Sequence, residues 1–383
     1  MPNILGLPAE TIGIIGGGQL GKMLAVSASK MGIEIISLDP SPNPPISSLC
    51  KELIVGSLMD ERKIFEVAKK SDLLTFEIEH INVKALKKLV EEGYKVFPSP
   101  SILEVINDKL KQRKFLHERG FPVPNFKYLP LDEIKSLKPP FVQKARSGGY
   151  DGRGVCIVKT TEDLKNLLPT DSYIEELIDI EIEFAVLTAR NQRGEIATYP
   201  IVEMVFNEEA NILDMLISPA RVPTEVSREA KKIAEAFIEE VKGVGVFAIE
   251  MFLSGSGKIF INEIAPRVHN SGHHTIESCL TSQFEQHIRA ITNLPLGSTR
   301  QILPAVMINL LGEPGYRGKP VIVGLEEVLK LPGVNVHIYG KIETRPYRKM
   351  GHVTIVGDSM EDVIKKAKIV KEKLKITGDE RYE

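Results

Sequence analysis

The sequence has few cysteines, no excess of charge of either sign and no long apolar run, and each shortage excludes a class of protein. The three cysteines, Cys50, Cys156 and Cys279, lie far apart without metal-binding spacing, which fits a reducing cytoplasm better than a disulfide framework. The net charge is -2, so no overall basic field would hold nucleic acid or an anionic membrane. No uncharged apolar run reaches about 18 residues, the length that spans a bilayer, and the apolar start lacks a basic residue before Lys22, so no signal peptide is expected. We therefore expect a cytoplasmic protein that acts on small molecules, with neither nucleic acid nor a membrane as partner.

The chain is an ordinary globular mixture, with 43% hydrophobic residues, and its 383 residues are enough for two or three domains. Strands and helices alternate in the N-terminal part, which predicts a parallel sheet, whereas strands predominate further on. The predicted fold class is therefore mixed α/β and α+β. We expect an N-terminal Rossmann-like domain over 1–97, a central domain over 98–297, a small C-terminal domain over 298–376 and a frayed tail over 377–383.

Hydrophobic periodicity predicts the individual elements. Strands are expected at residues 11–15, 34–39, 73–79, 95–97, 140–144, 155–159, 172–177, 183–189 and 196–205, with a hairpin at 245–253 and 258–264. Helices are expected at residues 20–31, in the segment that ends near residue 119, at 225–242 and at 361–374.

The first glycine-rich loop, Gly-Gly-Gly-Gln-Leu-Gly at 16–21, follows a predicted strand and opens a predicted helix. It fits the dinucleotide-binding pattern, and Asp39 stands at the end of the next strand, where a ribose-binding acid is found in such folds. However, free N–H groups at the N-terminus of a helix favour an anion of any kind, commonly a phosphate. The loop alone therefore leaves three alternatives: NAD, a phosphorylated metabolite, or a purely structural tight turn.

The second glycine-rich loop is more informative about chemistry. A strand delivers Lys144, and four glycines follow within residues 148–154, together with the basic residues Arg146 and Arg153. Such a loop can fold over a polyphosphate, with backbone N–H groups and a lysine as donors. It lacks the P-loop pattern, and a surface hairpin with incidental charge is the alternative.

Two acids lie on the predicted hairpin around the turn 254–257. Regular pairing places Glu250 opposite Ile261, with Glu263 as its diagonal neighbour on the same face, roughly 7–8 Å away at the backbone. Two carboxylates that converge in this way suit magnesium, which completes its coordination with phosphate oxygens and water. A solvated outer face is the alternative. Asn262 points the other way in a regular strand, so a role for it at this site needs a local bend.

The segment after the hairpin contains His269 and His273, four residues apart. This spacing could indicate zinc, but Pro266 and Gly272 argue against a helix there, and no cysteine is near enough to complete a tetrahedral set. Structural histidines, or a polar loop that holds an anionic substrate beside the metal, are the other interpretations.

Taken together, a phosphate loop, paired acids on a hairpin and flanking α/β domains resemble the ATP-grasp superfamily. Within it, the chain is similar to the 5-(carboxyamino)imidazole ribonucleotide synthase family, over nearly its whole length. The motifs that carry the resemblance, in chain order, are GGGQLG at 16–21, TFE at 75–77, GGYDGRG at 148–154, NEIAPR at 262–267, HNSGH at 269–273, SQFEQH at 282–287, MINLLG at 307–312, YGK at 339–341 and RKMGH at 348–352.

The resemblance implies an ATP-grasp architecture and an enzyme of purine biosynthesis. Such an enzyme uses ATP, magnesium and bicarbonate to carboxylate the exocyclic amine of 5-aminoimidazole ribonucleotide through carboxyphosphate, and releases ADP and phosphate. Family members are commonly homodimers. Another ATP-grasp carboxylase or a formate-using transformylase is the nearest alternative. An NAD-dependent oxidoreductase explains only the first glycine loop, and a non-catalytic nucleotide-binding protein is disfavoured because Lys144, Glu250 and Glu263 are all present.

The resemblance also assigns roles to residues of this chain. The ATP-binding residues are Lys109, Lys144, Gly149, Tyr150, Asp151, Gly152, Arg153, Gly154, Val155, Glu175, Glu176, Leu177, Ile178, Glu183, Phe206, Asn262 and Glu263. The residues around bicarbonate and the ribonucleotide are Tyr150, Asp151, Arg267, His269, Asn270, Lys341 and Arg348, with Gln19 and Leu20 at the ribonucleotide's phosphate and Glu250 and Glu263 on magnesium. Phe206 is a departure, because the family has a histidine there and phenylalanine cannot form that hydrogen bond.

Overall fold

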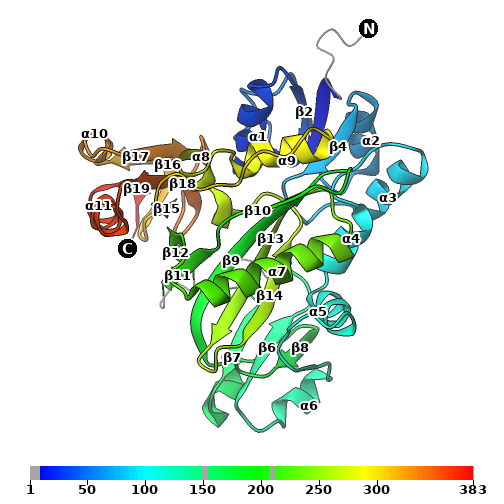
Figure 1. Cartoon of the computed structure of the whole chain (residues 1–383), viewed down its shortest axis with the longest axis vertical. Helices are drawn as coiled ribbons and strands as arrows, with labels where there is room; N and C mark the ends of the chain where they lie inside the picture. The colour runs from blue at the N-terminus through cyan, green and yellow to red at the C-terminus, as the bar shows by residue number, and fades with distance from the viewer. Residues whose placement is uncertain (1–8, 149–153, 208–211, 383) are drawn as a thin grey trace.

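The computed structural model describes residues 9–148, 154–207 and 212–382. Figure 1 shows an N-terminal sheet at the top, a long sheet through the middle, a small sheet at the bottom and the C-terminal elements at the left. The expected mixture of a parallel N-terminal sheet with a largely antiparallel remainder is confirmed. No helix in these described ranges is long and apolar enough to cross a membrane.

The N-terminal sheet has four parallel strands in the order β3-β2-β1-β4. Its strands are β1 (Thr11–Ile15), β2 (Glu34–Asp39), β3 (Glu52–Val55) and β4 (Leu73–Phe76), and its helices are α1 (Gln19–Ser29), α2 (Glu61–Lys69) and α3 (Val83–Glu91). Strands of a parallel sheet are usually covered on both faces, and in β4 all four residues are buried, whereas the edge strand β3 is partly exposed. The prediction missed β3, and residues 95–97 form only an isolated bridge, Val96 with Leu74.

Two helices, α4 (Pro100–Ile106) and α5 (Lys109–Glu118), replace the single helix predicted before residue 119. The helix is interrupted because Asp108 adopts an extended conformation. Its carboxylate caps α5 and accepts from the N–H groups of Leu110 and Lys111. The small antiparallel sheet follows, in the order β5-β8-β6-β7. Its elements are β5 (Phe126–Lys127), α6 (Leu131–Lys135), β6 (Phe141–Ala145), β7 (Val155–Val158), a 3₁₀ turn (Thr161–Asn166) and β8 (Ser172–Glu175).

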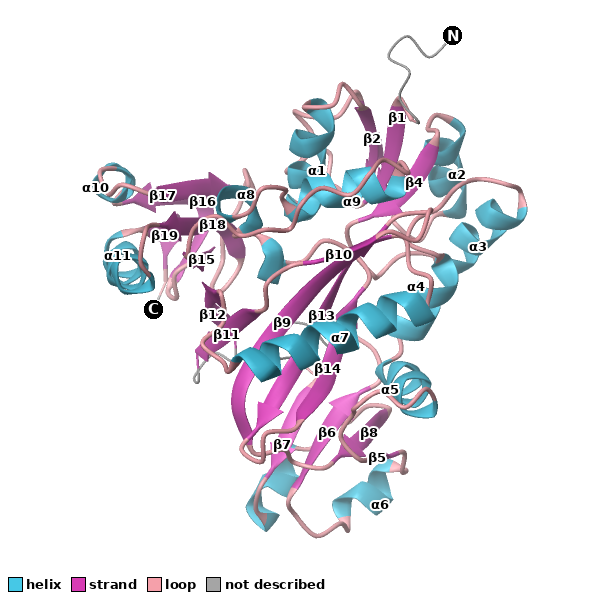
Figure 2. Cartoon of the chain, in the orientation of Figure 1, coloured by secondary structure: helices cyan, strands magenta, loops and turns pink. Residues whose placement is uncertain are grey.

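The long sheet has the order β14-β13-β9-β11-β12-β15-β18-β17, with β10 beside β9. Its strands are β9 (Ile180–Arg190), β10 (Ile196–Thr198), β11 (Val202–Asn207), β12 (Ile212–Ser218), β13 (Gly245–Ser254), β14 (Ile259–Ala265), β15 (Ala305–Leu311), β17 (Val334–Ile338) and β18 (Lys349–Val356). Helix α7 (Thr224–Glu240) lies across one face (Figure 2), and α9 (Gln283–Ile291) packs on the other face and against α1. Successive side chains of β13 point to opposite faces of the sheet and so contribute to the hydrophobic core on each face. Val246 and Ala248 face α9, whereas Phe247 and Ile249 face α7.

The C-terminal part is not a separate sheet, since β15, β18 and β17 continue the central one. It adds β16 (Tyr316–Val323), α10 (Leu325–Leu329), α11 (Met360–Lys373) and β19 (Lys375–Arg381). The prediction of a frayed tail at 377–383 is wrong for residues 377–381, which belong to β19 and pair with β16. The polar ending hides this strand, whose register is fixed by Ile376, a buried residue opposite Ile322.

Candidate active site

The β13–β14 hairpin carries the two predicted metal ligands, but its register differs from the prediction. Met251 pairs with Ile261, and the next pair is Glu250 with Glu263, so Asn262 is the extra residue of a β-bulge. The diagonal placement is therefore wrong, and the two acids stand directly opposite each other. Directly opposite residues have Cβ atoms about 4.5–5.5 Å apart, so the two side chains leave the backbone closer together than in the diagonal placement.

The bulge also supplies the local bend that a role for Asn262 requires. The Lys144 ammonium of β6 donates to Asn262 Oδ1 at 2.9 Å and lies 2.9 Å from the Glu175 carboxylate of β8. Arg113 of α5 pairs with Glu175 at 2.6 Å and donates to the carbonyl oxygens of Ile261 and Asn262 at 2.6 and 3.0 Å. Arg113 therefore holds the bulge in place, a contact that the sequence did not predict.

Burial and mutual repulsion perturb the acids of this site. Burial alone would raise the pKa of Glu175, but Lys144 and Arg113 outweigh it and hold the pKa of this carboxyl below its usual value. Burial raises the pKa of Glu183 on β9 to about 7, and burial together with the charges of Glu263 and Glu183 raises the pKa of Glu250 to about 8. A group of acids that resist ionisation beside one another is the arrangement that a bound cation would stabilise.

The donor chemistry fits magnesium with few protein ligands. Glu263 Oε2 lies 2.9 Å from the Lys109 ammonium, and Glu250 faces it across the bulge. Within the described ranges no three or more His, Cys, Asp or Glu residues gather as a metal cluster. Two carboxylates with the remaining positions left to phosphate oxygens and water is a common magnesium arrangement.

The loop after β14 places two predicted residues beside Glu250. His269 Nε2 lies 3.6 Å from Glu250 Oε1, and its Nδ1 lies 2.9 Å from Ser271 Oγ. Burial, with help from Arg267 and Lys349, keeps the pKa of His269 well below its usual value, so the ring is neutral. The Asn270 Nδ2 amide is buried and has no hydrogen-bond partner among the described residues. Such a donor is ready to contact a bound anion.

The zinc interpretation of this loop finds no support in the geometry. His273 is 1% exposed, and its ring lies 4.6 Å from the ring of His352 and 5.8 Å from that of Phe284. It is packed as a structural histidine, and burial is the main reason that its pKa is well below the usual value. The Arg267 guanidinium lies 2.7 Å from the Glu79 carboxylate, at the carboxyl end of the N-terminal sheet. This ion pair joins the loop after β14 to the N-terminal domain.

The first glycine loop is already occupied by carboxylates of the chain. Glu77 accepts from the N–H groups of Gly18 at 2.6 Å and Gly21 at 2.7 Å, and Asp39 accepts from Gly17 at 2.8 Å. Asp39 is therefore engaged with the loop itself, which weakens the NAD interpretation. In the described structure, the N–H groups of Gln19 and Leu20, the two predicted substrate residues, keep no protein acceptor.

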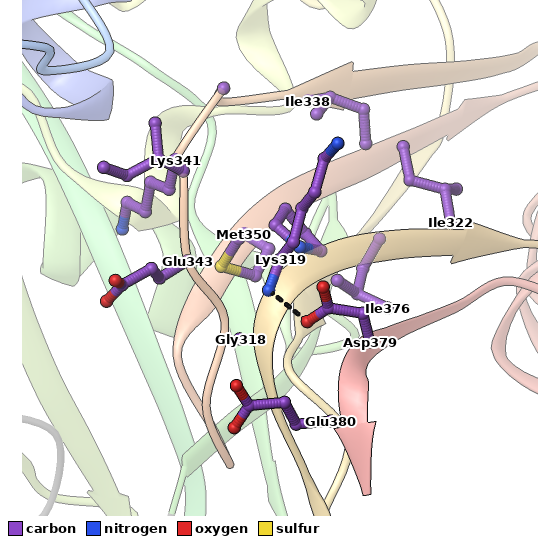
Figure 3. A pocket seen from close by; sticks show the side chains of 13 residues that line it. Gly318, Lys319, Ile322, Ile338, Lys341, Glu343, Met350, Ile376, Asp379 and Glu380 are labelled. Atoms are coloured by element: carbon purple, nitrogen blue, oxygen red, sulfur yellow. Dashed lines mark hydrogen bonds between the residues drawn. The ribbon is translucent and has the colours of Figure 1, made fainter.

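Lys341 and Arg348 lie in the connection between β17 and β18 and line two neighbouring hollows. The Lys341 ammonium donates to the Lys349 carbonyl oxygen at 2.7 Å. It lies at the edge of a hollow of about 630 Å³ and points away from the isoleucines that line the hollow, Ile322, Ile338 and Ile376 (Figure 3). Arg348 donates to the Glu343 carbonyl oxygen at 2.8 Å and lines a second hollow of about 510 Å³. The predicted meeting of the two cations on one phosphate stays a prediction. The sequence did not predict a role for Lys349, although its charge acts on both Glu250 and His269.

The remaining predicted residues lie around the small sheet and β11. Glu176, Leu177 and Ile178 connect β8 to β9, and Glu176 accepts from Asn125 N and Nδ2, each at 2.9 Å. Phe206 of β11 is half-buried against the cluster that includes Met204. Gly154 and Val155 begin the return of the second glycine loop into β7. The other predicted residues of this loop, Gly149, Tyr150, Asp151, Gly152 and Arg153, lie outside the described residues.

These features define an ATP-grasp protein, and family models agree along the chain. The ribonucleotide synthetase preATP-grasp domain matches residues 9–107, the ATP-grasp domain 114–284 and the phosphoribosylaminoimidazole carboxylase C-terminal domain 305–366. The N5-carboxyaminoimidazole ribonucleotide synthase of Synechococcus elongatus is 36% identical over 91% of this chain and 90% of its own length. The chain therefore belongs to the N5-carboxyaminoimidazole ribonucleotide synthase family.

Solved structures and longer relatives agree with this assignment. The synthetase from Thermotoga maritima has a TM-score of 0.90 and 51% identity, covering 97% of this chain and 100% of that chain. The Aspergillus clavatus enzyme, solved with ADP and 5-aminoimidazole ribonucleotide, has a TM-score of 0.86 and 30% identity, covering 95% of this chain and 98% of that chain. The phosphoribosylaminoimidazole carboxylase of Vigna aconitifolia is 40% identical over 94% of this chain, which spans only 66% of that longer protein.

Proposed function

We propose that this protein uses ATP and bicarbonate to carboxylate the exocyclic amine of 5-aminoimidazole ribonucleotide, giving 5-(carboxyamino)imidazole ribonucleotide, ADP and phosphate in de novo purine biosynthesis. The observation that carries the proposal is the bulge that sets Glu250 opposite Glu263 beside Lys109 and Lys144, in a chain of this family. The substrate is inferred from the relatives, and the residues of this chain account for how it would be bound and carboxylated.

ATP would lie between the small sheet and the β13–β14 hairpin. Lys109 and Lys144 would meet its phosphates, and the connection from Glu175 to Ile178 would receive the base. Glu183, whose pKa is about 7, would accept hydrogen bonds from the ribose hydroxyls. Glu250 and Glu263 would hold magnesium, which would neutralise charge on the transferred phosphoryl group.

Transfer of the γ-phosphoryl group to a bicarbonate oxygen gives ADP and carboxyphosphate, which collapses to carbon dioxide and phosphate. The amine then attacks carbon dioxide and loses one proton. Positioning and charge stabilisation do most of this work. Arg267, neutral His269 and the unpartnered Asn270 amide would hold the anionic reactants beside Glu250, together with Tyr150 and Asp151.

The ribonucleotide would bridge the N-terminal and C-terminal parts. Its phosphate would meet the N–H groups of Gln19 and Leu20 on one side and Lys341 and Arg348 on the other. We place Phe206 in apolar contact with the nucleotide, because it offers a half-buried ring where the family has a hydrogen-bonding histidine. We also propose domain boundaries near residues 97 and 297, a homodimeric state and a cytoplasmic location.

Release of ADP, measured with and without the ribonucleotide and with and without bicarbonate, tests the proposal. We expect rapid release of ADP only when the ribonucleotide and bicarbonate are both present. A carboxylated product should then be detected by an analysis that avoids acid. Equal turnover with formate in place of bicarbonate would instead identify a transformylase. Turnover that ignores the ribonucleotide would reject the proposed substrate.

A further inference from the structure

One lysine crosses from the N-terminal domain to the C-terminal strands. The Lys22 ammonium, on α1, donates to the carbonyl oxygens of Ile338 and Tyr339 at 3.0 and 3.1 Å, at the end of β17. Lys22 is half-buried, and burial lowers its pKa. None of the ion pairs found in the described ranges involves Lys22, so this cation is partly removed from water to bind two main-chain carbonyls rather than a carboxylate.

The two carbonyls stand beside a sharp turn. Gly340 follows them with φ of +85°, in the left-handed region, and a side chain there would begin 3.7 Å from the Lys22 ammonium. The turn redirects the chain from β17 to Lys341. An ammonium has three N–H donors and no acceptor, so it can hold two adjacent carbonyl oxygens of such a turn at once.

Buried side chains surround this contact on both sides. Tyr339 is 2% exposed and lies in the same apolar cluster as Leu20 and Met23 of α1. Its hydroxyl lies 3.0 Å from His352 Nδ1 on β18. Lys22 follows the first turn of α1, which begins with Gln19, so it connects that end of the helix to the chain that leads into Lys341.

We propose that Lys22 is a positioning residue of the ribonucleotide site, which fixes the distance between the N–H groups of Gln19 and Leu20 and the ammonium of Lys341. This inference rests on the proposed function, in which these groups share one substrate. Lys22 does not touch the substrate. It acts through the spacing of groups that do, and a remote change that misplaces such groups by about 1 Å can cost up to about 100-fold in activity.

Kinetics of Lys22→Met test the proposal, with Lys22→Arg as the conservative variant and Lys30→Met as a matched control from the exposed end of α1. We expect Lys22→Met to raise the KM for the ribonucleotide by about 10- to 100-fold while the KM for ATP changes less than about twofold. Arginine also donates to two carbonyls and should restore most of the affinity, and Lys30→Met should behave as the wild type.

A double-mutant cycle separates positioning from general destabilisation. If Lys22 acts through Lys341, adding Lys22→Met to Lys341→Ala should change the ribonucleotide KM little beyond the single Lys341→Ala effect. Additive effects, an unchanged KM in Lys22→Met, or an equal rise in the KM of both substrates would each overturn the inference. If Lys22→Met does not fold, the same cycle is run with Lys22→Gln. Failure of the wild type to use the ribonucleotide would reject the proposed function instead.

Discussion

Replacing Glu250 with glutamine should stabilise the free protein while it abolishes ATP turnover. The pKa of Glu250 is about 8 in the folded protein, against an ordinary value of 4.5 that applies once the chain unfolds. Between pH 4.5 and 8 the folded state therefore holds a proton that the unfolded state has released. Over that window the free energy of unfolding falls by about 1.4 kcal/mol per pH unit.

This linkage fixes the size of the effect and its dependence on pH. The penalty from Glu250 is small at pH 5, reaches about 3 kcal/mol at pH 7 and levels off at about 4–5 kcal/mol above pH 8. Glutamine does not ionise, so the Glu250→Gln variant escapes the penalty. The difference in unfolding free energy between variant and wild type should grow in the same way.

Denaturant unfolding at pH 5, 7 and 8.5, without nucleotide and with a chelator present, measures this difference. Glu181→Gln, an exposed acid at the start of β9, is the matched control and should change the stability little at any pH. Magnesium and ADP together should stabilise the wild type more than Glu250→Gln. Equal stabilities at pH 8.5, or a difference that does not grow with pH, would show that Glu250 is not held in a raised-pKa state by burial and its neighbours.

Three further predictions follow from the site. Arg113→Met should destabilise the protein by about 3–5 kcal/mol in denaturant unfolding, because it leaves the buried Glu175 carboxylate without one of its two cations; a loss below 1 kcal/mol, the size of an exposed pair, would contradict this. Lys341→Ala should raise the ribonucleotide KM by about 10- to 100-fold, as expected for loss of a charge-assisted contact, and an unchanged KM in steady-state assays would show that Lys341 does not contact the ribonucleotide. Calorimetry should detect binding of the ribonucleotide but not of NAD or NADP, because Asp39 and Glu77 take the N–H groups of Gly17, Gly18 and Gly21 and leave those of Gln19 and Leu20 for a single phosphate; tight dinucleotide binding would refute that argument.

Several elements could be predicted from local patterns, although the strand expected at 196–205 is divided into β10 and β11, and β3 and β12 were not predicted. Strand β1, helix α1 and strand β2 follow directly from a buried apolar run, helical spacing and a proline cluster. The hairpin and α7 were predicted to within about two residues for the same reason. Strand β19 was missed because its polar end shows no apolar alternation after Ile376, and its place depends on β16, more than fifty residues earlier in the chain.

The site was predicted less completely, because its decisive contacts join distant segments. Glu250 and Glu263 could be found from the hairpin, but their direct opposition depends on a bulge that Arg113 holds from α5. The glycine loop was recognised, whereas the Glu77 carboxylate that occupies it comes from the residue just after β4, 59 residues away from Gly18. Periodicity carries no information about such pairings, so the resemblance to a family supplied the residue roles that spacing could not.

The pairing of β12 with β15 has a consequence for how the chain is made. After the first three hundred residues have been synthesised the nucleotide-binding parts are complete, but β12 would still present an open edge that contains the apolar residues Leu216 and Ile217. Unpaired edges of this kind recruit other strands. Truncation before β15 should therefore give an aggregating product rather than a working ATPase. The last eighty residues cover the edge of β12 and so prevent its pairing with strands of other molecules.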